Sequence, residues 1–234
     1  MSNLYKFFVA DQPVKRGRWI FLLTLLPFIS GWAQPSFSEF TIARVRYGGG
    51  GDWYNDPSAT RNMLTFFKSK FNLPCQEQEA KVSIMDEELH SYPFLFLTGH
   101  GQIRFGQKEV IRLRNYLQNG GFLYVDDDYG LDKSFRSQMA KVFPDAEFLE
   151  IPFSHPIYHI VYPFERGLPK IHEHDGGPPK GYGIFYKDRM VVFYSFNTNI
   201  SDGWADPEVH DNPPQVRENA LKMGLNIITF ALTY

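Results

Sequence analysis

The stretch of residues 92–130 constrains the fold of this chain more than any other part of the sequence. Two short apolar runs, at residues 94–97 and 122–125, flank a segment in which apolar residues recur every three or four positions. This pattern predicts a helix between two buried strands, and a connection of this length makes the strands parallel, with a right-handed crossover. Ligands of parallel sheets bind beyond the carboxyl ends of the strands. We therefore expect the functional edge at residues 98–101 and 126–128.

The rest of the chain adds elements of the same kind. Ser58 and Asp132 are expected to cap helices, and a third helix is expected to begin after Asn212-Pro213, with proline at its first position. Further strands are expected at residues 40–47, 76–84, 146–151, 182–186 and 190–196, the last two as a hairpin. The pattern predicts one domain at residues 40–234, a three-layer α/β/α fold that is flavodoxin-like in outline and has a mostly parallel sheet.

The N-terminus has the pattern of a signal peptide at residues 1–33, followed by a short linker at residues 34–39. Lys15, Arg16 and Arg18 precede an apolar run too short to span a bilayer, and Gly31 and Ala33 occupy the small-residue positions of a cleavage site. We expect export to the periplasm or cell envelope. The signal segment is then the only part of the chain expected to contact the membrane. The alternative is a membrane-associated segment that stays attached.

The charge of the exported chain argues against nucleic acid as a partner. Loss of residues 1–33 removes four of the 24 basic residues and one of the 26 acidic residues, which leaves 20 and 25 and a formal charge of −5. A general nucleic-acid binder needs a basic stripe. A small molecule or an envelope protein is the expected partner, and the sequence does not indicate an oligomeric state.

The central stretch resembles the ThuA-like and class I glutamine amidotransferase-like superfamily. The matching residues are Thr98-Gly99-His100 after one strand, Gly120-Gly121 after the helix and Val125-Asp126 at the end of the next strand. With the RYGGGGDWYNDP stretch at residues 46–57 and the late Tyr194-Ser195 and Asp202-Gly203-Trp204, the chain resembles an uncharacterised bacterial domain family within that superfamily. The resemblance implies the fold and no established activity.

The chain departs from the amidotransferases at the residue that would act as nucleophile. Those enzymes place a cysteine at a strand-to-helix elbow, whereas residues 126–130 here contain neither cysteine nor serine. Cys75 is the only cysteine, lies well upstream and has no adjacent base, so we expect a buried, inert thiol. Glutamine hydrolysis by the usual route is not expected.

Asp126, Asp127 and Asp128 are the main chemical signal. On a strand, Asp126 and Asp128 share one face and Asp127 lies on the other. Clustered carboxylates favour a bound cation, such as Ca²⁺, Mg²⁺ or Mn²⁺, or a proton held at raised pKa. The alternative is that the three only cap a helix, face solvent and accept amide hydrogen bonds. His100 is expected beside Asp126, where the two could do acid–base work. No other cofactor is evident.

A glycine-rich loop precedes the first helix. Its Gly49 and Gly50 either form an anion-binding nest or only let the main chain turn closely. Trp53 and Tyr54 either stack on a sugar ring or cover the end of the sheet. Asp52 in the same loop and Asn197 at a later strand exit complete the expected ligand-binding lining.

The histidines outside the central stretch give weaker signals. His155 and His159 are four residues apart, but Pro156 between them interrupts a regular helix and so disfavours a pair of metal ligands on one helical face. His172 and His174, with Asp175, could clasp a metal from an extended strand, but no motif surrounds them. We expect all of these to be surface histidines.

Three functional hypotheses follow. The first is an exported domain without the cysteine nucleophile that binds a ligand or protein partner at the strand exits. The second is a carboxylate- or metal-dependent hydrolase of an envelope substrate, with Asp127 or Asp128 as base and His100 as acid, which requires Asp126, Asp128 and His100 to converge. The third is a scaffold, which requires a large exposed apolar patch.

Overall fold

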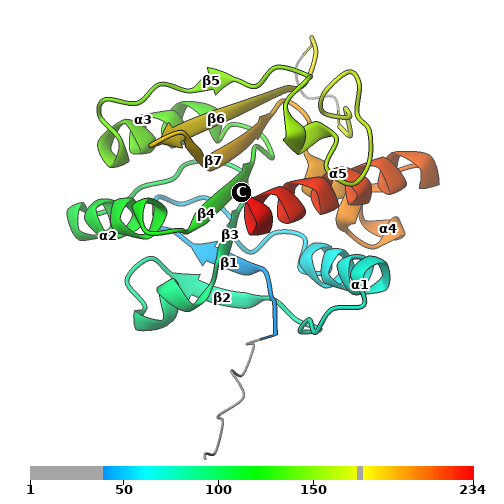
Figure 1. Cartoon of the computed structure of the whole chain (residues 1–234), viewed down its shortest axis with the longest axis horizontal. Helices are drawn as coiled ribbons and strands as arrows, with labels where there is room; N and C mark the ends of the chain where they lie inside the picture. Colours follow the sequence, from blue (N-terminus) through cyan, green and yellow to red (C-terminus); the bar gives the residue numbers. More distant parts are fainter. Residues whose placement is uncertain (1–38, 173–175) are drawn as a thin grey trace, which may run out of the picture. The chain divides into compact units, whose positions relative to one another are not determined.

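The computed structural model describes residues 39–172 and 176–234, which lie in the compact unit Ser38–Tyr234 (Figure 1). The strands are β1 Ala43–Arg46, β2 Ala80–Ser83, β3 Phe94–Leu97, β4 Phe122–Asp126, β5 Leu149–Glu150, β6 Lys180–Tyr186 and β7 Arg189–Phe196. The α-helices are α1 Ala59–Phe71, α2 Gln107–Gln118, α3 Asp132–Val142, α4 Pro207–His210 and α5 Pro214–Thr233. Three short 3₁₀-helices are η1 Glu87–Ser91, η2 Pro156–Tyr158 and η3 Ile200–Trp204.

The seven strands form one mostly parallel sheet in the order β2-β1-β3-β4-β7-β6-β5. β2, β1, β3, β4 and β7 run parallel to one another. β6 is antiparallel to both of its neighbours, β7 and β5. β3 and β4 pair directly, with Phe94 opposite Phe122, so the strand–helix–strand unit predicted from residues 92–130 is confirmed.

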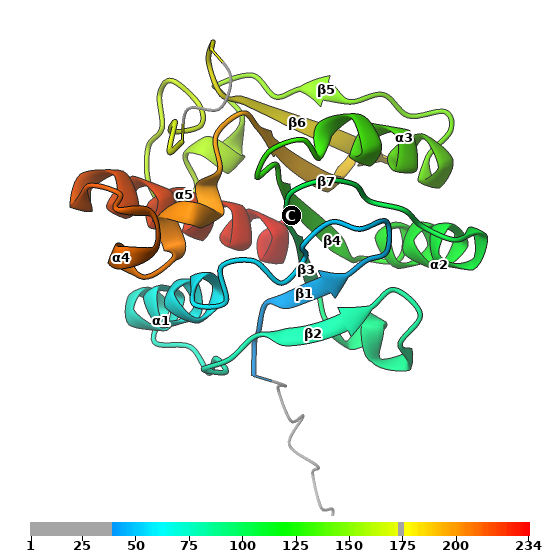
Figure 2. The ribbon, with the colours of Figure 1, turned by 180° about the vertical axis from the view of Figure 1, so that it is seen from behind.

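Helices cover both faces of the sheet, which confirms the predicted three layers. Alternate residues of a strand point to opposite faces. Phe94 and Phe96 therefore join the core that α1 and α5 cover, whereas Leu95 and Leu97 join the core beneath α2 and α3. In Figure 1, α2 and α3 lie to the left of the sheet and α1 and α5 to the right, and Figure 2 shows the same layers from behind.

Trp204 fixes the segment after β7 to the last helix. Its side chain is fully buried, and its indole Nε1 donates a 2.9 Å hydrogen bond to the carbonyl oxygen of Ala220 in α5. A Cβ on Gly224 would lie 2.6 Å from Trp204 Cζ2. The absence of that Cβ lets α5 approach η3 closely, and this contact holds the strand exit in place.

Local details differ from the sequence predictions in two caps. Ser58 makes no capping hydrogen bond with α1, because its Oγ instead accepts from the backbone N–H of Asp206. Asp132 is the first residue of α3 and Leu131 is the N-cap, so Asp132 is not the cap. The hairpin of β6 and β7 is confirmed, and its turn residues Lys187 and Asp188 have φ of 49° and 64°.

The predicted signal peptide at residues 1–33 and nearly all of the predicted linker at 34–39 lie outside the described residues, as do His174 and Asp175. Among the residues that are described, no helix is long and apolar enough to cross a membrane.

Candidate functional site

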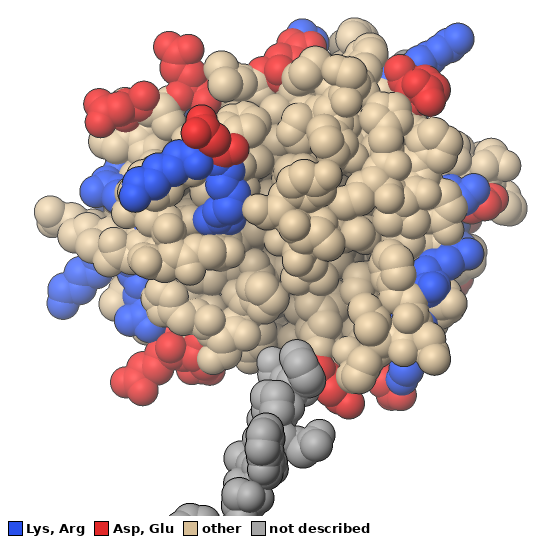
Figure 3. Space-filling view, in the orientation of Figure 1, with Lys and Arg blue, Asp and Glu red and all other residues tan. Residues whose placement is uncertain are grey.

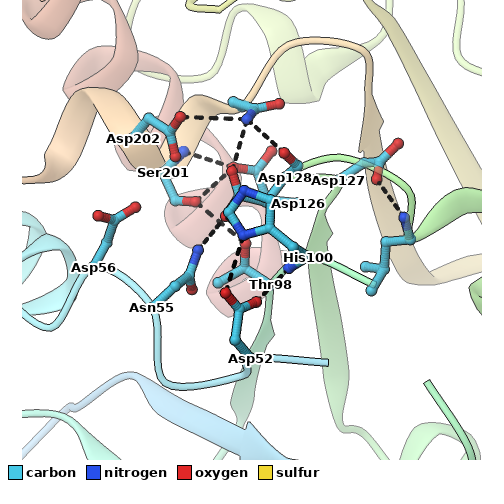
Figure 4. Close-up of polar contacts among 12 residues, drawn as sticks. Asp52, Asn55, Asp56, Thr98, His100, Asp126, Asp127, Asp128, Ser201 and Asp202 are labelled. Atoms are coloured by element: carbon cyan, nitrogen blue, oxygen red, sulfur yellow. Dashed lines mark hydrogen bonds and ion pairs between the residues drawn. The ribbon is translucent and has the colours of Figure 1, made fainter. Parts of the chain in front are cut away.

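The loops that follow β1, β3, β4 and β7 meet at one edge of the sheet, because the carboxyl ends of parallel strands all point the same way (Figure 4). Every sequence-predicted site residue lies in these four loops or at the end of β4. The structure thus brings the candidates to one region, but it gives them different partners.

Asp126 ties two strand exits together. Its side chain is fully buried, its Oδ1 accepts a hydrogen bond from Ser195 Oγ, and its Oδ2 accepts from Ser201 N at 2.6 Å and Ser201 Oγ at 2.7 Å. Burial raises the pKa of Asp126 to about 6, although the hydrogen bonds from Ser195 and Ser201 oppose the rise. With both oxygens occupied, Asp126 positions η3 against β4 and is not free to bind a ligand.

Asp127 lies on the opposite side, as the alternation predicts. Its Oδ1 accepts a 3.2 Å hydrogen bond from the backbone N–H of Leu131 just before α3, and burial raises its pKa. Asp127 also lines a pocket of about 340 Å³ between the exits of β4 and β7. The other lining residues are Tyr129, Gly130, Asp132, Lys133, Phe196, Asn197 and Asn199.

Asp128 faces the same side as Asp126 and is only 2 % exposed. It accepts hydrogen bonds from the side-chain amides of Asn55 and Asn199, the latter at 2.7 Å. Burial, together with the negative charge of Asp202 and its neighbours, raises the pKa of Asp128 to about 9. Asp128 therefore holds a proton more tightly than an exposed aspartate does.

His100 approaches Asp128 and not Asp126, so the sequence prediction of its partner is wrong. Its Nδ1 lies 3.4 Å from Asp128 Oδ2 and 3.1 Å from Asp52 Oδ2. The backbone N–H of His100 also donates to Asp52 Oδ1. The imidazole is half exposed, so Asp52 orients a solvent-accessible histidine above a buried carboxyl group.

The glycine-rich loop packs against the loop after β3. Gly51 N donates to the carbonyl of Gln102 and Asp52 N donates to the carbonyl of His100, so these two N–H groups are not available to an anion. A Cβ on Gly49, whose φ is 114°, would lie 2.7 Å from Arg104 N. Close approach of two loops therefore accounts for the glycine at 49, whereas Gly50 has no such neighbour.

Of the remaining residues predicted to line a ligand site, one lines the pocket and two lie outside it. Trp53 packs against the core beneath α2 and α3, while Tyr54 is 62 % exposed and meets Trp53 edge-on. Asn197 has φ of 58°, and its Oδ1 accepts a 2.6 Å hydrogen bond from Lys170 Nζ. Asn197 lines the pocket beside Asp127, but Trp53 and Tyr54 do not.

Four residues of the site were missed or misread at the sequence level. His172, Asp202, His210 and Asp56 lie together: His172 Nδ1 is 2.8 Å from Asp202 Oδ2, and His210 Nε2 is 2.9 Å from Asp56 Oδ1. The expectation that His172 is a mere surface histidine is wrong. His155, in contrast, accepts a hydrogen bond from the N–H of Ile157 at the start of η2, and its ring contacts that of Phe230.

Comparison with known proteins places the chain in a family. A family model described as Domain of unknown function (DUF4159) matches residues 41–232, nearly all of the described fold. The chain belongs to the DUF4159 family. No curated protein matches the DUF4159 chain in sequence. The geometry above therefore has to carry the functional argument for this DUF4159 domain.

Proposed function

We propose that this DUF4159 domain binds a small polar molecule at the carboxyl edge of its sheet and does not hydrolyse glutamine. The observation that carries the proposal is the 340 Å³ pocket between the exits of β4 and β7. Its volume suits a small ligand, and its position is where open parallel sheets bind theirs.

The backbone beside the pocket supports a binding role. Tyr129 has φ of 137° and leaves 52 % of its surface exposed. A non-glycine residue in that region is strained by about 1–3 kcal/mol, and such strain persists where the surrounding fold enforces it, often at ligand sites. Tyr129 thus offers an aromatic face at the pocket rim at some cost to stability.

The lining indicates the chemistry of the ligand. Asp127 and Asp132 supply the carboxylate oxygens of this lining, Asn197 adds an amide whose Oδ1 already accepts from Lys170 Nζ, and Lys133 adds a single ammonium donor. A ligand that carries several hydroxyl or amine donors on a compact carbon frame would match these acceptors and stack on Tyr129.

Cysteine-dependent chemistry at this edge has no support in the structure. Cys75 is 5 % exposed, and its backbone forms an isolated β-bridge with Phe40, which precedes β1. Cys75 therefore lies near the amino ends of the parallel strands. Burial raises the pKa of its thiol, which disfavours the reactive thiolate.

Fragment screening by protein-observed NMR tests the binding proposal. We expect polyols, sugars or small amines to shift signals of Tyr129, Phe196 and Asn197, and Asn197→Ala to weaken the shifts. A second pocket of about 440 Å³, lined by Arg114, Phe143 and Tyr186 among others, is the internal control. Binding only at that second pocket contradicts the proposal.

A hydrolase is the second candidate, favoured by the Asp52–His100–Asp128 arrangement. His100 and Asp128 converge as this hypothesis requires, whereas Asp126 is fully engaged elsewhere. An exposed histidine oriented by a carboxylate can transfer protons to a substrate. Chromogenic esters, phosphates and glycosides test it: turnover that disappears in His100→Gln supports the candidate, and turnover unchanged in that variant contradicts it.

Export to the periplasm or envelope and membership of the ThuA-like superfamily remain parts of this proposal, resting on the N-terminal pattern and the motif resemblance. The face in Figure 3 shows Lys and Arg scattered among Asp and Glu, which agrees with a partner other than nucleic acid. A scaffold role ranks last, because large exposed apolar side chains such as Ile111, Leu149 and Val209 come from different elements, α2, β5 and α4.

A further inference from the structure

Two histidines and three aspartates from separate segments meet at the exit of β7. They form two overlapping trios that share one residue, and within each trio the ligand atoms lie within 4.8 Å of one another. The trios are His172, Asp202, His210 and Asp56, Asp128, Asp202. In Figure 4, Asp202 and Asp56 are drawn to the left of Asp128.

Asp202 is the centre of this cluster and is incompletely satisfied. Its side chain is 2 % exposed, and its Oδ2 lies 2.8 Å from His172 Nδ1. Its Oδ1 is buried and accepts no hydrogen bond from an N–H or hydroxyl group of the described residues, and its ion-pair partner His210 Nε2 is 3.8 Å away. A buried carboxylate oxygen without a partner costs free energy, and a cation relieves that cost.

The distances suit a metal ion held between these groups. Ligands about 2.0–2.2 Å from a tetrahedral metal ion lie roughly 3.4 Å from one another. The separations here bracket that value: 2.8 Å for His172 to Asp202, 2.9 Å for His210 to Asp56, and 3.8 Å for His210 Nε2 to Asp202 Oδ1. Small side-chain rotations are therefore enough to aim one atom each of His172, Asp202 and His210 at a common point, with Asp56 beside His210.

The donor types select the class of metal. Imidazole nitrogens with carboxylate oxygens suit Zn²⁺ and neighbouring transition metals, whereas Ca²⁺ and Mg²⁺ prefer oxygen alone. The cluster also gathers three carboxyl groups that are largely buried, and a dication offsets the negative charge that these groups carry when they are ionised.

We propose that His172, Asp202 and His210 bind one divalent transition-metal ion, with Asp56 as a fourth ligand. Asp128 lies next to the ion and is held by Asn55 and Asn199. The proposal goes beyond ligand binding at the neighbouring pocket and stands without it, because the pocket lining and the proposed ligands share no residue.

Zinc binding by the full chain tests the proposal. Protein stripped with EDTA is titrated with Zn²⁺ by calorimetry, and Co²⁺ is then used as a probe whose visible spectrum reports nitrogen and oxygen ligands. We expect one ion per chain and a shift of the Co²⁺ bands in His172→Gln and His210→Gln. Each of these variants should weaken Zn²⁺ binding by about tenfold or more, since even outer-shell losses cost 10–100-fold.

Two other histidine variants are the matched controls. His90→Gln changes a histidine on η1 whose ring lies against that of Tyr116 at a tilt of 53°, away from the cluster, and should leave the Zn²⁺ affinity unchanged. His174→Gln changes a histidine outside the described residues. Circular dichroism confirms that each variant is folded. Absence of Zn²⁺ binding, equal affinity in His210→Gln, or loss of binding only in His174→Gln overturns the proposal.

Discussion

The buried ion pair between Arg44 and Glu79 offers the sharpest test of how the functional edge is supported. The Arg44 side chain in β1 is 1 % exposed, and its Nε lies 2.7 Å from Glu79 Oε2. Its guanidinium also donates to the carbonyl oxygens of Trp53, Asn55 and Asp56, at 3.3, 3.0 and 3.4 Å. One buried cation therefore fixes the loop that carries Asp56.

Replacement by the apolar Arg44→Met leaves the Glu79 carboxylate buried, with the neutral Thr60 hydroxyl at 2.5 Å and the more distant Lys81 ammonium at 3.7 Å. Breaking a buried pair from one side costs about 3–5 kcal/mol, most of it from the uncompensated charge. In a domain of this size about 1 kcal/mol shifts the melting temperature by about 2–4 °C. We expect Arg44→Met to lower Tm by roughly 6–20 °C.

Urea unfolding of the single variants Arg44→Met and Glu79→Gln and of the double variant measures the pair. The double variant should lose less stability than the sum of the single losses, because removing both charges leaves neither one stranded. A loss below about 1 kcal/mol in Arg44→Met, or losses that simply add, would refute the reasoning.

Three smaller predictions concern packing, thiol chemistry and the hairpin turn. Gly224→Ala should lower the free energy of unfolding by about 1–3 kcal/mol in urea, because its Cβ would meet Trp204, whereas Gly176→Ala, with open space around it, should not. Cys75 should react with a thiol reagent far more slowly in native than in denatured protein, since it is buried with a raised pKa; equal rates would contradict this. Asp188→Gly should raise the unfolding free energy by about 0.5–1 kcal/mol, because glycine adopts the positive φ of this turn without strain, and a loss of stability would count against it.

The fold was largely predictable because its signals are local. The apolar runs at β3 and β4 and the helical spacing of α2 indicated a parallel pair directly, and the alternation at residues 126–128 correctly put Asp127 on the face opposite its neighbours. The caps were less predictable. Ser58 was recruited by Asp206, a residue 148 positions away, and no local pattern reports such a contact.

The site was only half visible in the sequence for the same reason. Asp128 and His100 stand at strand exits that the pattern locates, so their place at one edge followed from the sheet, although the pattern paired His100 with Asp126 and not with Asp128. His172 and His210 lie in segments without a clear periodic pattern. The backbone N–H of His172 donates to the carbonyl oxygen of Thr198, and α4, which ends at His210, follows η3 directly. Long-range packing, unlike strand order, produces no local sequence pattern at the residues that it brings into contact.

The span of the Asp56–His210 contact bears on how this domain acquires its site. These two side chains lie 154 residues apart in sequence and touch only when β1 and α4 are both in place. The loop between them must close before the contact can form, and contacts of such separation slow folding. A chain released before α4 is synthesised would therefore lack His210 entirely. Completion of this cluster therefore requires translation at least through α4 and packing of α4 against the loop that carries Asp56.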